Sequence, residues 1–556
     1  MSRTGGVPGA AGRFQQWLLR ARRLLGNTVT AGVRTAGDGR LVDFTVAARH
    51  LVGGLMERPT GRVSASVYET GRLVTLAPWL TGHTERLRFL LETQRPDGAW
   101  VSPLPAYALI PTLSATEALL STLRKPDPHG HAGVPRAESE KAAGRGLAIL
   151  SRWLDGTHAL ELPDMPAAEH IAPVLINMIN QHLRHEGVRL QSSPGLDGST
   201  VEKVQALLAR GGQVPQKFLH ALEIAQEAAR GAPSVRPEPT GSVGASPAAT
   251  AAWLGDHESA DWGGSARRFL ESAARRDGGP VPTAIPIANF ERAWVLSWLA
   301  SAGIELAVPP EMISELRSAL GPNGASAGAG LPADADTSAG VLYALSLHGA
   351  PQSPDLLWAY ETETHFCTWQ GENGRSVTTN AHVLEAFGHH LQSTGGGESA
   401  GRYQATVAKV SSWLCAQQGD DGGWRDRWHA SPYYATVCAA LALHRFGGAA
   451  SAPAVERAVR WVVGTQRPDG SWGRWGGTAE ETAYALQVLV LTGGGASEET
   501  ARAATRGGGY LRSVAESAME ANNPPLWHDK DLYCPIAVVR AAVLAALHLT
   551  RRNVLA

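Results

Sequence analysis

Cysteine is scarce in this chain, and its few copies form no pattern. Four cysteines occur among 556 residues, with no Cys-x-x-Cys pair and no other short spacing: Cys367, Cys415, Cys438 and Cys534. Disulfide-stapled secreted domains and zinc knuckles both need clustered cysteines. The pattern therefore argues against both kinds of protein and favours a reducing compartment, for which we predict the cytoplasm.

A surplus of charge and a long apolar run are also missing. The formal net charge is −1, which argues against a nucleic-acid-binding protein that works by broad electrostatic attraction. No run of about 20 uncharged apolar residues occurs, so no membrane-spanning helix is expected. Residues 1–40 are basic, with an amphipathic stretch but no clean apolar signal core. We expect a partly disordered lead-in with one helix there, whose contact with a membrane would be peripheral.

The chain is long, has many apolar residues and repeats one motif. Its 556 residues, of which 44% are hydrophobic, suit two domains. The pattern Gln-x-x-Asp-Gly-x-Trp occurs at residues 94–100, 418–424 and 466–472, and the last two copies begin 48 residues apart. Such a period is typical of stacked or circularly arranged helix pairs. Because Asp-Gly favours a turn and the Trp can lie back over a helix end, we interpret the copies as structural.

Helical patterns dominate the rest of the sequence. Residues 289–304 place three aromatic residues at four-residue spacing on one face and end at a glycine. Residues 479–495 begin with acidic side chains, continue with apolar ones and close with glycines. Strand patterns are few. Two stretches rich in Pro and Gly break the helical patterns, and we place a domain boundary near the second: residues 231–250 and 277–288.

These repeats, together with a D-x-D motif at a predicted helix start, resemble the class II terpene cyclases. That family comprises the squalene–hopene cyclases and the diterpene cyclases that make copalyl diphosphate. The likeness runs from about residue 41 to 548. Further segments that share it are GRVSASVYETGRLVTLAPWL (61–80), GSVGASPAATAAWL (241–254), IANFERAWVLSWLASAGI (287–304), TTNAHVLEA (378–386), DRWHASPYYAT (426–436), GGTAEETAYAL (476–486) and LWHDKDLYCPIAVVRAAVL (526–544).

The resemblance implies an all-α fold of two (α/α) barrels, which are called β and γ in this family. The γ barrel would occupy residues 58–280. The β barrel would comprise residues 281–548 together with a helix at 41–57. The active site would lie between the barrels, with its acid contributed by the β barrel.

The acid motif of the family is D-x-D-D, and its middle aspartate corresponds to Asp336. Protonating an isolated C=C bond needs a carboxylic acid that stays protonated near neutral pH. Two adjacent carboxylates in a poorly hydrated site share one proton, because two negative charges there are disfavoured. A helix N-terminus favours the anion that remains after proton release. We therefore predict that Asp336 is the general acid and Asp334 its polarising partner; the simpler alternative is that Asp334 only caps a helix.

The neighbourhood of this motif carries two further predictions. Thr337 replaces the last aspartate of the family pattern. This departure leaves the acid in place, but the family pattern then no longer predicts how protons reach the acid or how long the substrate is. Asn380 is predicted to hydrogen-bond the acid, whereas His382 is interpreted as a core histidine.

A carbocation needs a dry cavity lined by aromatic faces, which attract positive charge without acting as nucleophiles. The chain has 17 Trp, more than its 10 Tyr or its 9 Phe. Five aromatic residues lie in segments that resemble cavity-lining parts of the family. We predict that they bind substrate, with plain core packing as the alternative: Trp294, Trp369, Trp428, Tyr433 and Tyr434.

The family also implies how the diphosphate end of a substrate is handled. Class II enzymes retain this group, so it must be held without being ionised off. Lys530 matches a lysine in the family's GK-x-LY segment and is predicted to bind phosphate, with a solvated surface lysine as the alternative. Mg²⁺ is expected with the diphosphate, but no E-D-x-x-D motif occurs, so its ligands stay unnamed. His220 is a candidate base, although a packed helix histidine is the preferred interpretation.

The metal-binding motifs of class I cyclases, D-D-x-x-D and (N/D)-D-x-x-(S/T)-x-x-x-E, are absent. The resemblance therefore implies protonation-initiated bicyclisation of geranylgeranyl diphosphate to a copalyl- or labdane-type diphosphate. A class I terpene synthase or a phosphatase would then consume the product.

Three alternatives stay open. The first is a cyclase that converts farnesyl diphosphate to a drimane-type product. The second is an (α/α)-barrel glycosidase, whose carboxylates should lie several Å apart on different elements. The third is a non-catalytic, prenyl-binding α-toroid. The sequence also leaves open the stereochemistry, the position of final deprotonation or water capture, and the oligomeric state.

Overall fold

The computed structural model describes most of the chain from residue 43 to residue 552. The gaps are 125–132, 156–159, 161, 163, 188, 193–195, 197, 256–263, 494–496 and 520–522. The lead-in predicted over residues 1–40 lies outside the described residues. Within them, helices make up the regular structure and extended pairing is limited to isolated bridges. The all-α prediction is confirmed. None of the described helices is both long enough and apolar enough to cross a membrane.

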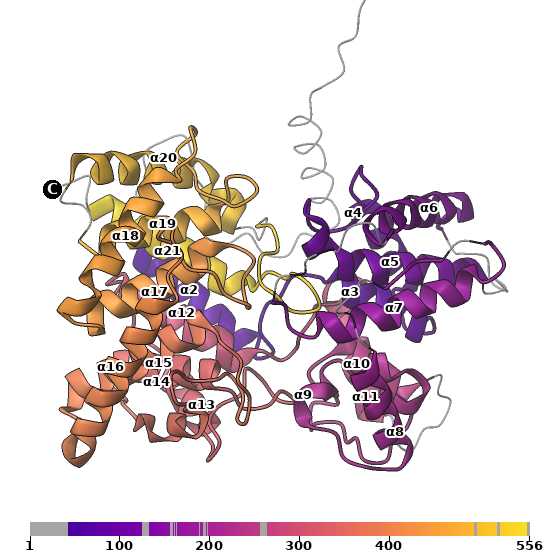
Figure 1. The fold of residues 1–556 in the computed structure, drawn as a ribbon, viewed down its shortest axis with the longest axis horizontal. Helices are drawn as coiled ribbons and strands as arrows, with labels where there is room; N and C mark the ends of the chain where they lie inside the picture. The colour runs from indigo at the N-terminus through magenta and orange to yellow at the C-terminus, as the bar shows by residue number, and fades with distance from the viewer. Residues whose placement is uncertain are drawn as a thin grey trace, which may run out of the picture.

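The C-terminal half forms a barrel whose inner helices close into a ring (Figure 1). Each inner helix packs on the next and the last packs on the first: α12 (Ala288–Ser301), α14 (Ala335–Leu347), α15 (Val377–Thr394), α17 (Pro432–Phe446), α19 (Ala479–Leu491) and α21 (Ile536–Arg552). Outer elements cover this ring: α13 (Pro310–Ala319), η2 (Pro354–Tyr360), η3 (Gly397–Ser399), α16 (Ala400–Ala416), η4 (Ala449–Ser451), α18 (Ala452–Gly464) and α20 (Glu498–Met519). Because the inner helices are covered on both sides, they are apolar around most of their circumference.

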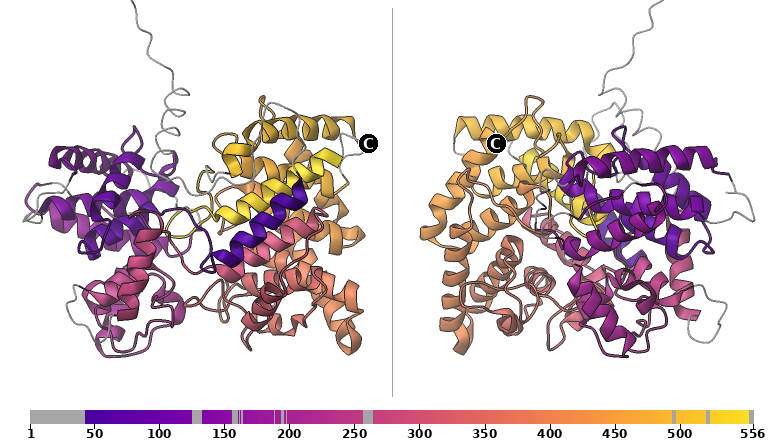
Figure 2. Two further views of the ribbon diagram at one scale, coloured as in Figure 1. Left: turned by 180° about the vertical axis from the view of Figure 1, so that it is seen from behind. Right: turned by 45° about the vertical axis from the view of Figure 1, so that its right-hand side comes forward.

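The first described helix belongs to this same barrel, although most of the N-terminal half separates it in sequence. Helix α2 (Phe44–Glu57) begins after Asp43, whose carboxylate accepts hydrogen bonds from two backbone amides of the first turn. It packs against α12 and α21. Figure 2 shows it in indigo beside the yellow α21. Its buried side chains Ala48, Val52 and Leu55 join the apolar core of the C-terminal barrel. The N- and C-terminal segments of the described chain therefore complete one domain.

The N-terminal barrel has a smaller inner ring. In ring order it contains α3 (Val67–Leu76), α5 (Pro105–Arg124), α7 (Ala168–Leu183), the 3-10 helix η1 (Leu222–Ala229) and α10 (Pro247–Leu254). Further helices lie around it: α4 (His83–Thr93), α6 (Arg136–Trp153), α8 (Ser199–Ala209), α9 (Gln216–Leu219) and α11 (Gly264–Arg276). On this packing we propose the division into residues 58–280 and 281–548, with α2 added to the second barrel.

The three Gln-x-x-Asp-Gly-x-Trp copies have the same geometry. In the first copy, Trp100 is fully buried and its indole N–H donates to the Leu90 carbonyl at 2.7 Å, near the end of the preceding helix. Gln94 donates to the Ala142 carbonyl of the next helix at 2.9 Å. Asp97 accepts from the Ala99 amide at 3.1 Å and closes the turn. The other copies repeat these contacts at 418–424 and 466–472. Each copy therefore fastens one helix end to the next helix.

The two barrels meet through loops. Val63 forms an isolated bridge with Pro535, and Ala65 forms one with Pro282. These contacts bring the chain around residues 61–66 against the segment that leads into α21. The join therefore lies beside the ends of the inner helices of both barrels (Figure 1).

Candidate active site

Asp334 and Asp336 lie at the N-terminus of α14. Asp334 is the N-cap: its Oδ1 accepts from the Thr337 amide at 2.6 Å and its Oδ2 from the Thr337 hydroxyl at 2.9 Å. Thr337, the departure from the family pattern, thus fixes the rotamer of Asp334. The side chain is buried. Burial, and then the charge of Asp336, raise the pKa of Asp334 to about 7.

Asp336 lies in the first turn of α14 and pairs with a histidine. Its Oδ1 is 2.8 Å from Nδ1 of His382 on α15. Burial alone would lower the pKa of His382, but the charge of Asp336 and its hydrogen bond outweigh burial, so the pKa is well above its usual range. His382 is thus a proton donor to Asp336. Asp336 keeps 18% of its side chain exposed, so it is the more accessible of the two aspartates.

Aromatic rings continue from this pair into the barrel. The ring of Trp294 on α12 lies edge-on to His382 with centroids 4.8 Å apart, and its N–H donates to the hydroxyl of Tyr434 at 2.7 Å. Trp294 also contacts Phe290 at 4.5 Å. Gly340 makes room for the indole, because a Cβ there would lie 2.4 Å from a Trp294 ring carbon. Two of the predicted aromatic residues, Trp294 and Tyr434, therefore lie in the acid centre.

The aromatic cluster extends on the far side of Tyr434. Its ring contacts Trp527 at 4.5 Å and His429 at 4.9 Å. Behind them, the fully buried Glu480 accepts from the Trp527 indole N–H at 2.8 Å and lies 3.1 Å from His429 Nε2. The buried carboxylate thus fixes the rings that face Tyr434.

Trp369 and Trp428 form a separate pair. Their rings pack edge to face with centroids 5.5 Å apart, and both are half-buried. Lys217, which comes from the N-terminal barrel, has its Nζ 5.9 Å from the Trp369 ring centroid. The pair therefore lies where the two barrels approach each other, apart from the rings that contact His382.

Two predicted residues take other roles. Tyr433 packs on Trp461 of the outer helix α18, with centroids 4.7 Å apart, so it points away from the ring occupied by Tyr434. Asn380 uses its amide on backbone: its Nδ2 donates to the carbonyls of Phe366 and Ser376 at 2.9 and 2.8 Å, and its Oδ1 accepts from the Phe366 amide. We correct both assignments, because Asn380 shapes the loop before α15 and His382 makes the contact with the acid.

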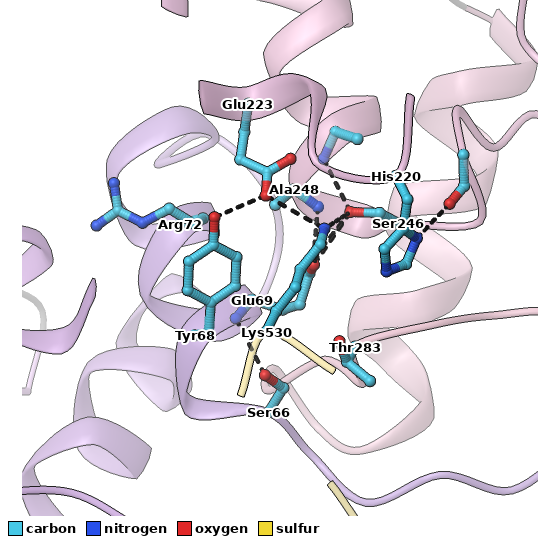
Figure 3. A network of polar contacts seen from close by, with 12 residues as sticks. Ser66, Tyr68, Glu69, Arg72, His220, Glu223, Ser246, Ala248, Thr283 and Lys530 are labelled. Carbon is cyan, nitrogen blue, oxygen red and sulfur yellow. Dashed lines mark hydrogen bonds and ion pairs between the residues drawn. The ribbon is translucent and has the colours of Figure 1, made fainter. Parts of the chain in front are cut away.

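Lys530 is neither a solvated lysine nor an unpaired cation (Figure 3). It is buried, and its Nζ lies 2.7 Å from Glu69 Oε1 and 3.2 Å from Glu223 Oε1, both in the N-terminal barrel. It also donates to Ser246 at 2.9 Å. Lys530 therefore forms a bridge to the N-terminal barrel and is not the solvated surface lysine of the alternative; that it binds phosphate stays a prediction.

His220 lies close to this bridge. Its Nε2 is 3.1 Å from both oxygens of Asp529, and Asp529 in turn accepts from Thr283 at 2.9 Å. Its Nδ1 contacts the Gly244 carbonyl. Both ring nitrogens are thus engaged, which supports the interpretation as a packed histidine rather than a base.

The chain is similar to known proteins along most of its length. The family model of the squalene-hopene cyclase C-terminal domain matches residues 375–520. An ent-copalyl diphosphate synthase of Streptomyces sp. (strain KO-3988) is 43% identical over 516 residues, which cover 91% of this chain and 96% of that protein. The chain belongs to the class II terpene cyclases.

Two further relatives support membership of the same family. A labda-7,13-dienyl diphosphate synthase of Streptomyces clavuligerus is 38% identical over 90% of this chain and 92% of that protein. The solved structure of the ent-copalyl diphosphate synthase from Streptomyces platensis superimposes with a TM-score of 0.85 at 42% identity, covering 91% of this chain and 99% of that one. The predicted family and its α-barrel architecture are confirmed.

The arrangement of the cyclase suits protonation of an apolar substrate. One carboxyl group, Asp336, is accessible and has a cationic donor behind it, while its partner Asp334 is buried. Aromatic rings lie beside them. Sequence reasoning missed His382; the signal available was an imidazole in the buried first half of an inner helix, three residues before the buried acid Glu385.

The described part of the cyclase contains no group of three or more His, Cys, Asp or Glu side chains placed to hold a metal ion. A bound Mg²⁺ usually takes one or two carboxylates together with substrate phosphates. Glu69 and Glu223 are two buried acids beside the join, but Lys530 forms ion pairs with both. These residues therefore do not fit a protein-built Mg²⁺ site.

Proposed function

We propose that this cyclase converts geranylgeranyl diphosphate to a bicyclic copalyl- or labdane-type diphosphate and leaves the diphosphate attached. The observation that carries the proposal is the Asp336–His382 pair at 2.8 Å beside the rings of Trp294 and Tyr434. The relatives are ent-copalyl and labda-7,13-dienyl diphosphate synthases, which supports a bicyclic diphosphate as the product.

The chemistry begins with the proton of Asp336. His382 holds Oδ1, so we assign the transferable proton to Oδ2. The terminal C=C bond of the substrate takes this proton as a new C–H bond, and the adjacent carbon becomes a tertiary cation. Two internal C=C bonds then attack in turn and form two rings. A proton finally leaves a carbon next to the last cation, so the product is an isomer of the substrate.

The protein residues have distinct tasks in this scheme. His382 stabilises the Asp336 carboxylate that remains after proton transfer. Asp334 lies close to Asp336, and two negative charges so close together are disfavoured. The two aspartates therefore retain one proton between them before substrate binds. Trp294 and Tyr434 offer aromatic faces to the cation.

A cyclase for farnesyl diphosphate remains the second candidate. The observation that favours it is Thr337 in the last position of the acid motif, where it hydrogen-bonds Asp334 at 2.9 Å. A shorter substrate would reach the same acid.

We further propose that Mg²⁺ accompanies the diphosphate, held mainly by its oxygens, and that the enzyme works in the cytoplasm. Since the product retains its diphosphate, a class I terpene synthase or a phosphatase must act after it.

The test is to incubate the purified full chain with each prenyl diphosphate and Mg²⁺, dephosphorylate the products and identify them by mass spectrometry. A bicyclic alcohol from the twenty-carbon substrate is expected. A bicycle from the fifteen-carbon substrate alone would support the second candidate, and no cyclic product from either would refute both.

The control variants address the acid. Asp336→Asn is expected to abolish turnover and to retain the helical circular dichroism of the parent. Asp420→Asn, a change at an exposed aspartate, is expected to leave turnover as it was. Appreciable cyclisation by Asp336→Asn would remove Asp336 from its role.

A further inference from the structure

A line of alternating charges leads away from the acid through the interior of the C-terminal barrel. Asp336 is followed by His382 and then by Glu385, one turn further along α15, and Arg445 of α17 follows. Arg445 Nη1 lies 3.8 Å from Glu385 Oε1.

Arg445 shows that this line runs inside the ring. Its Nη1 donates to Tyr343 on α14 at 2.9 Å and to Ser301 on α12 at 3.2 Å. Helices α17 and α12 are not neighbours in the ring, so the guanidinium reaches across the ring at the C-terminal ends of these helices. Glu385 is 9% exposed and follows His382 by three residues on α15, a spacing that places the two side chains on the same side of the helix.

The positive charge of His382 lacks a counter-ion when Asp336 is protonated. In that state Asp336 carries a proton and is neutral, so His382 loses its partner anion. A buried cation without a counter-ion tends to release its proton. A second anion beside His382 would prevent this release.

We propose that Glu385 is a positioning residue that keeps His382 protonated while Asp336 is loaded, and thereby makes Asp336 a stronger acid. This inference rests on the proposed function. A positive charge beside a carboxyl group favours its anion and so favours proton release to the substrate. Glu385 does not touch the substrate; it acts through His382.

The other groups that face this pair are compatible with the role. Cys438 of α17 lies beside His382, and Trp294 of α12 packs edge-on against it. Burial raises the pKa of Glu385, while His382 and Arg445 act in the opposite direction. The remaining neighbours of α15, the elements α16 and η2, meet its other face through aromatic contacts: Phe387 with Tyr403 and Trp358.

The decisive measurement is the titration of His382 in the full chain by NMR of labelled histidine, with His382→Asn used to assign its signal. In Glu385→Gln we expect the pKa of His382 to fall by about one pH unit or more, the size of effect that a nearby charge produces. The alkaline limb of the kcat profile should move to lower pH by a similar amount, with KM changed less than about twofold.

Two further variants make the result specific. Glu385→Asp keeps the charge and should restore most of both profiles. Glu291→Gln removes another buried glutamate of this barrel, one that accepts from the Arg62 amide at 2.8 Å, and should leave the His382 titration unchanged.

An unchanged His382 titration in Glu385→Gln would overturn the proposal, even if that variant were less stable. Should Glu385→Gln fail to fold, Glu385→Asn decides: it also removes the charge, so it must lower the His382 pKa, and an unchanged titration refutes the role. Because the titration needs no substrate, it stands apart from the turnover assay that tests the proposed function.

Discussion

Opposing effects act on the pKa of Asp334. Its two hydrogen bonds from Thr337 favour the carboxylate. Burial, and next the charge of Asp336, disfavour the carboxylate and raise the pKa of Asp334 from its ordinary value of 3.8 to about 7. The folded state therefore binds a proton more tightly than the unfolded chain does. Stability falls as pH rises from about 4 to 7 and stays reduced above pH 7.

Asp334→Asn should remove this cost. Asparagine can cap the helix as well as aspartate can, and its amide can donate to the Thr337 hydroxyl. We expect the variant to be more stable than the parent by roughly 2–4 kcal/mol at pH 8 and by little at pH 4, with turnover strongly reduced. Thermal unfolding at the two pH values measures this. A variant that is less stable at pH 8 would contradict the explanation.

Single residues also mark the limit of sequence reasoning. Asn380 and His382 are two positions apart, so they point in directions about 200° apart around α15. Tyr433 and Tyr434 differ by about 100° on α17. Both helices are buried on both sides, so no polar face shows which direction leads into the barrel. The motif could therefore be predicted, but not which of its residues faces the acid.

At the scale of the element, the Gln-x-x-Asp-Gly-x-Trp turns could be predicted from sequence because the Asp-Gly turn spans a few residues and the indole bond spans only ten. The Asp-Gly turn and the indole bond to the preceding helix end follow directly from residue type. The partner of the Gln could not be predicted, since Ala142 lies 48 residues beyond Gln94 on another helix.

Trp100 offers a test of the structural interpretation. Trp100→Ala should lower the free energy of unfolding by about 3–5 kcal/mol, because it removes a fully buried ring. Trp100→Phe should cost about 1–3 kcal/mol, mainly by leaving the Leu90 carbonyl without its donor. Denaturant unfolding gives both values.

A matched control lies in the same segment. Leu104→Ala, at a side chain that is 38% exposed, should change stability by less than about 0.5 kcal/mol. Turnover per folded molecule should be the same in all three variants. A loss of turnover in Trp100→Phe without loss of stability would mean that this turn does more than hold helices together.

At the scale of the whole molecule, the ion pairs of Lys530 with Glu69 and Glu223 join the two barrels. Lys530→Met would leave Glu69 and Glu223 buried without their cation, so we expect a loss of about 3–5 kcal/mol of stability. Burial raises the pKa of Glu69 to about 7, against the opposing effect of Lys530. The loss should therefore be larger at pH 8 than at pH 6, where the Glu69 carboxyl can take up a proton.

The double variant Lys530→Met with Glu69→Gln should recover part of this loss, because one uncompensated charge is removed. Thermal unfolding and limited proteolysis of the full chain follow the effect. Unchanged stability of Lys530→Met, with a raised KM for a prenyl diphosphate, would instead support the phosphate-binding role predicted from sequence.

Residues close together in the chain were enough to establish the all-α class, the repeated turns and the acid motif, because turn formation, helix capping and apolar periodicity are local properties. Three-dimensional packing was needed to learn that His382 holds the acid, that Tyr434 rather than Tyr433 faces inward, and that two glutamates surround Lys530. These contacts depend on how buried helices are rotated and on partners up to 461 residues apart. Local sequence carries no direct record of either.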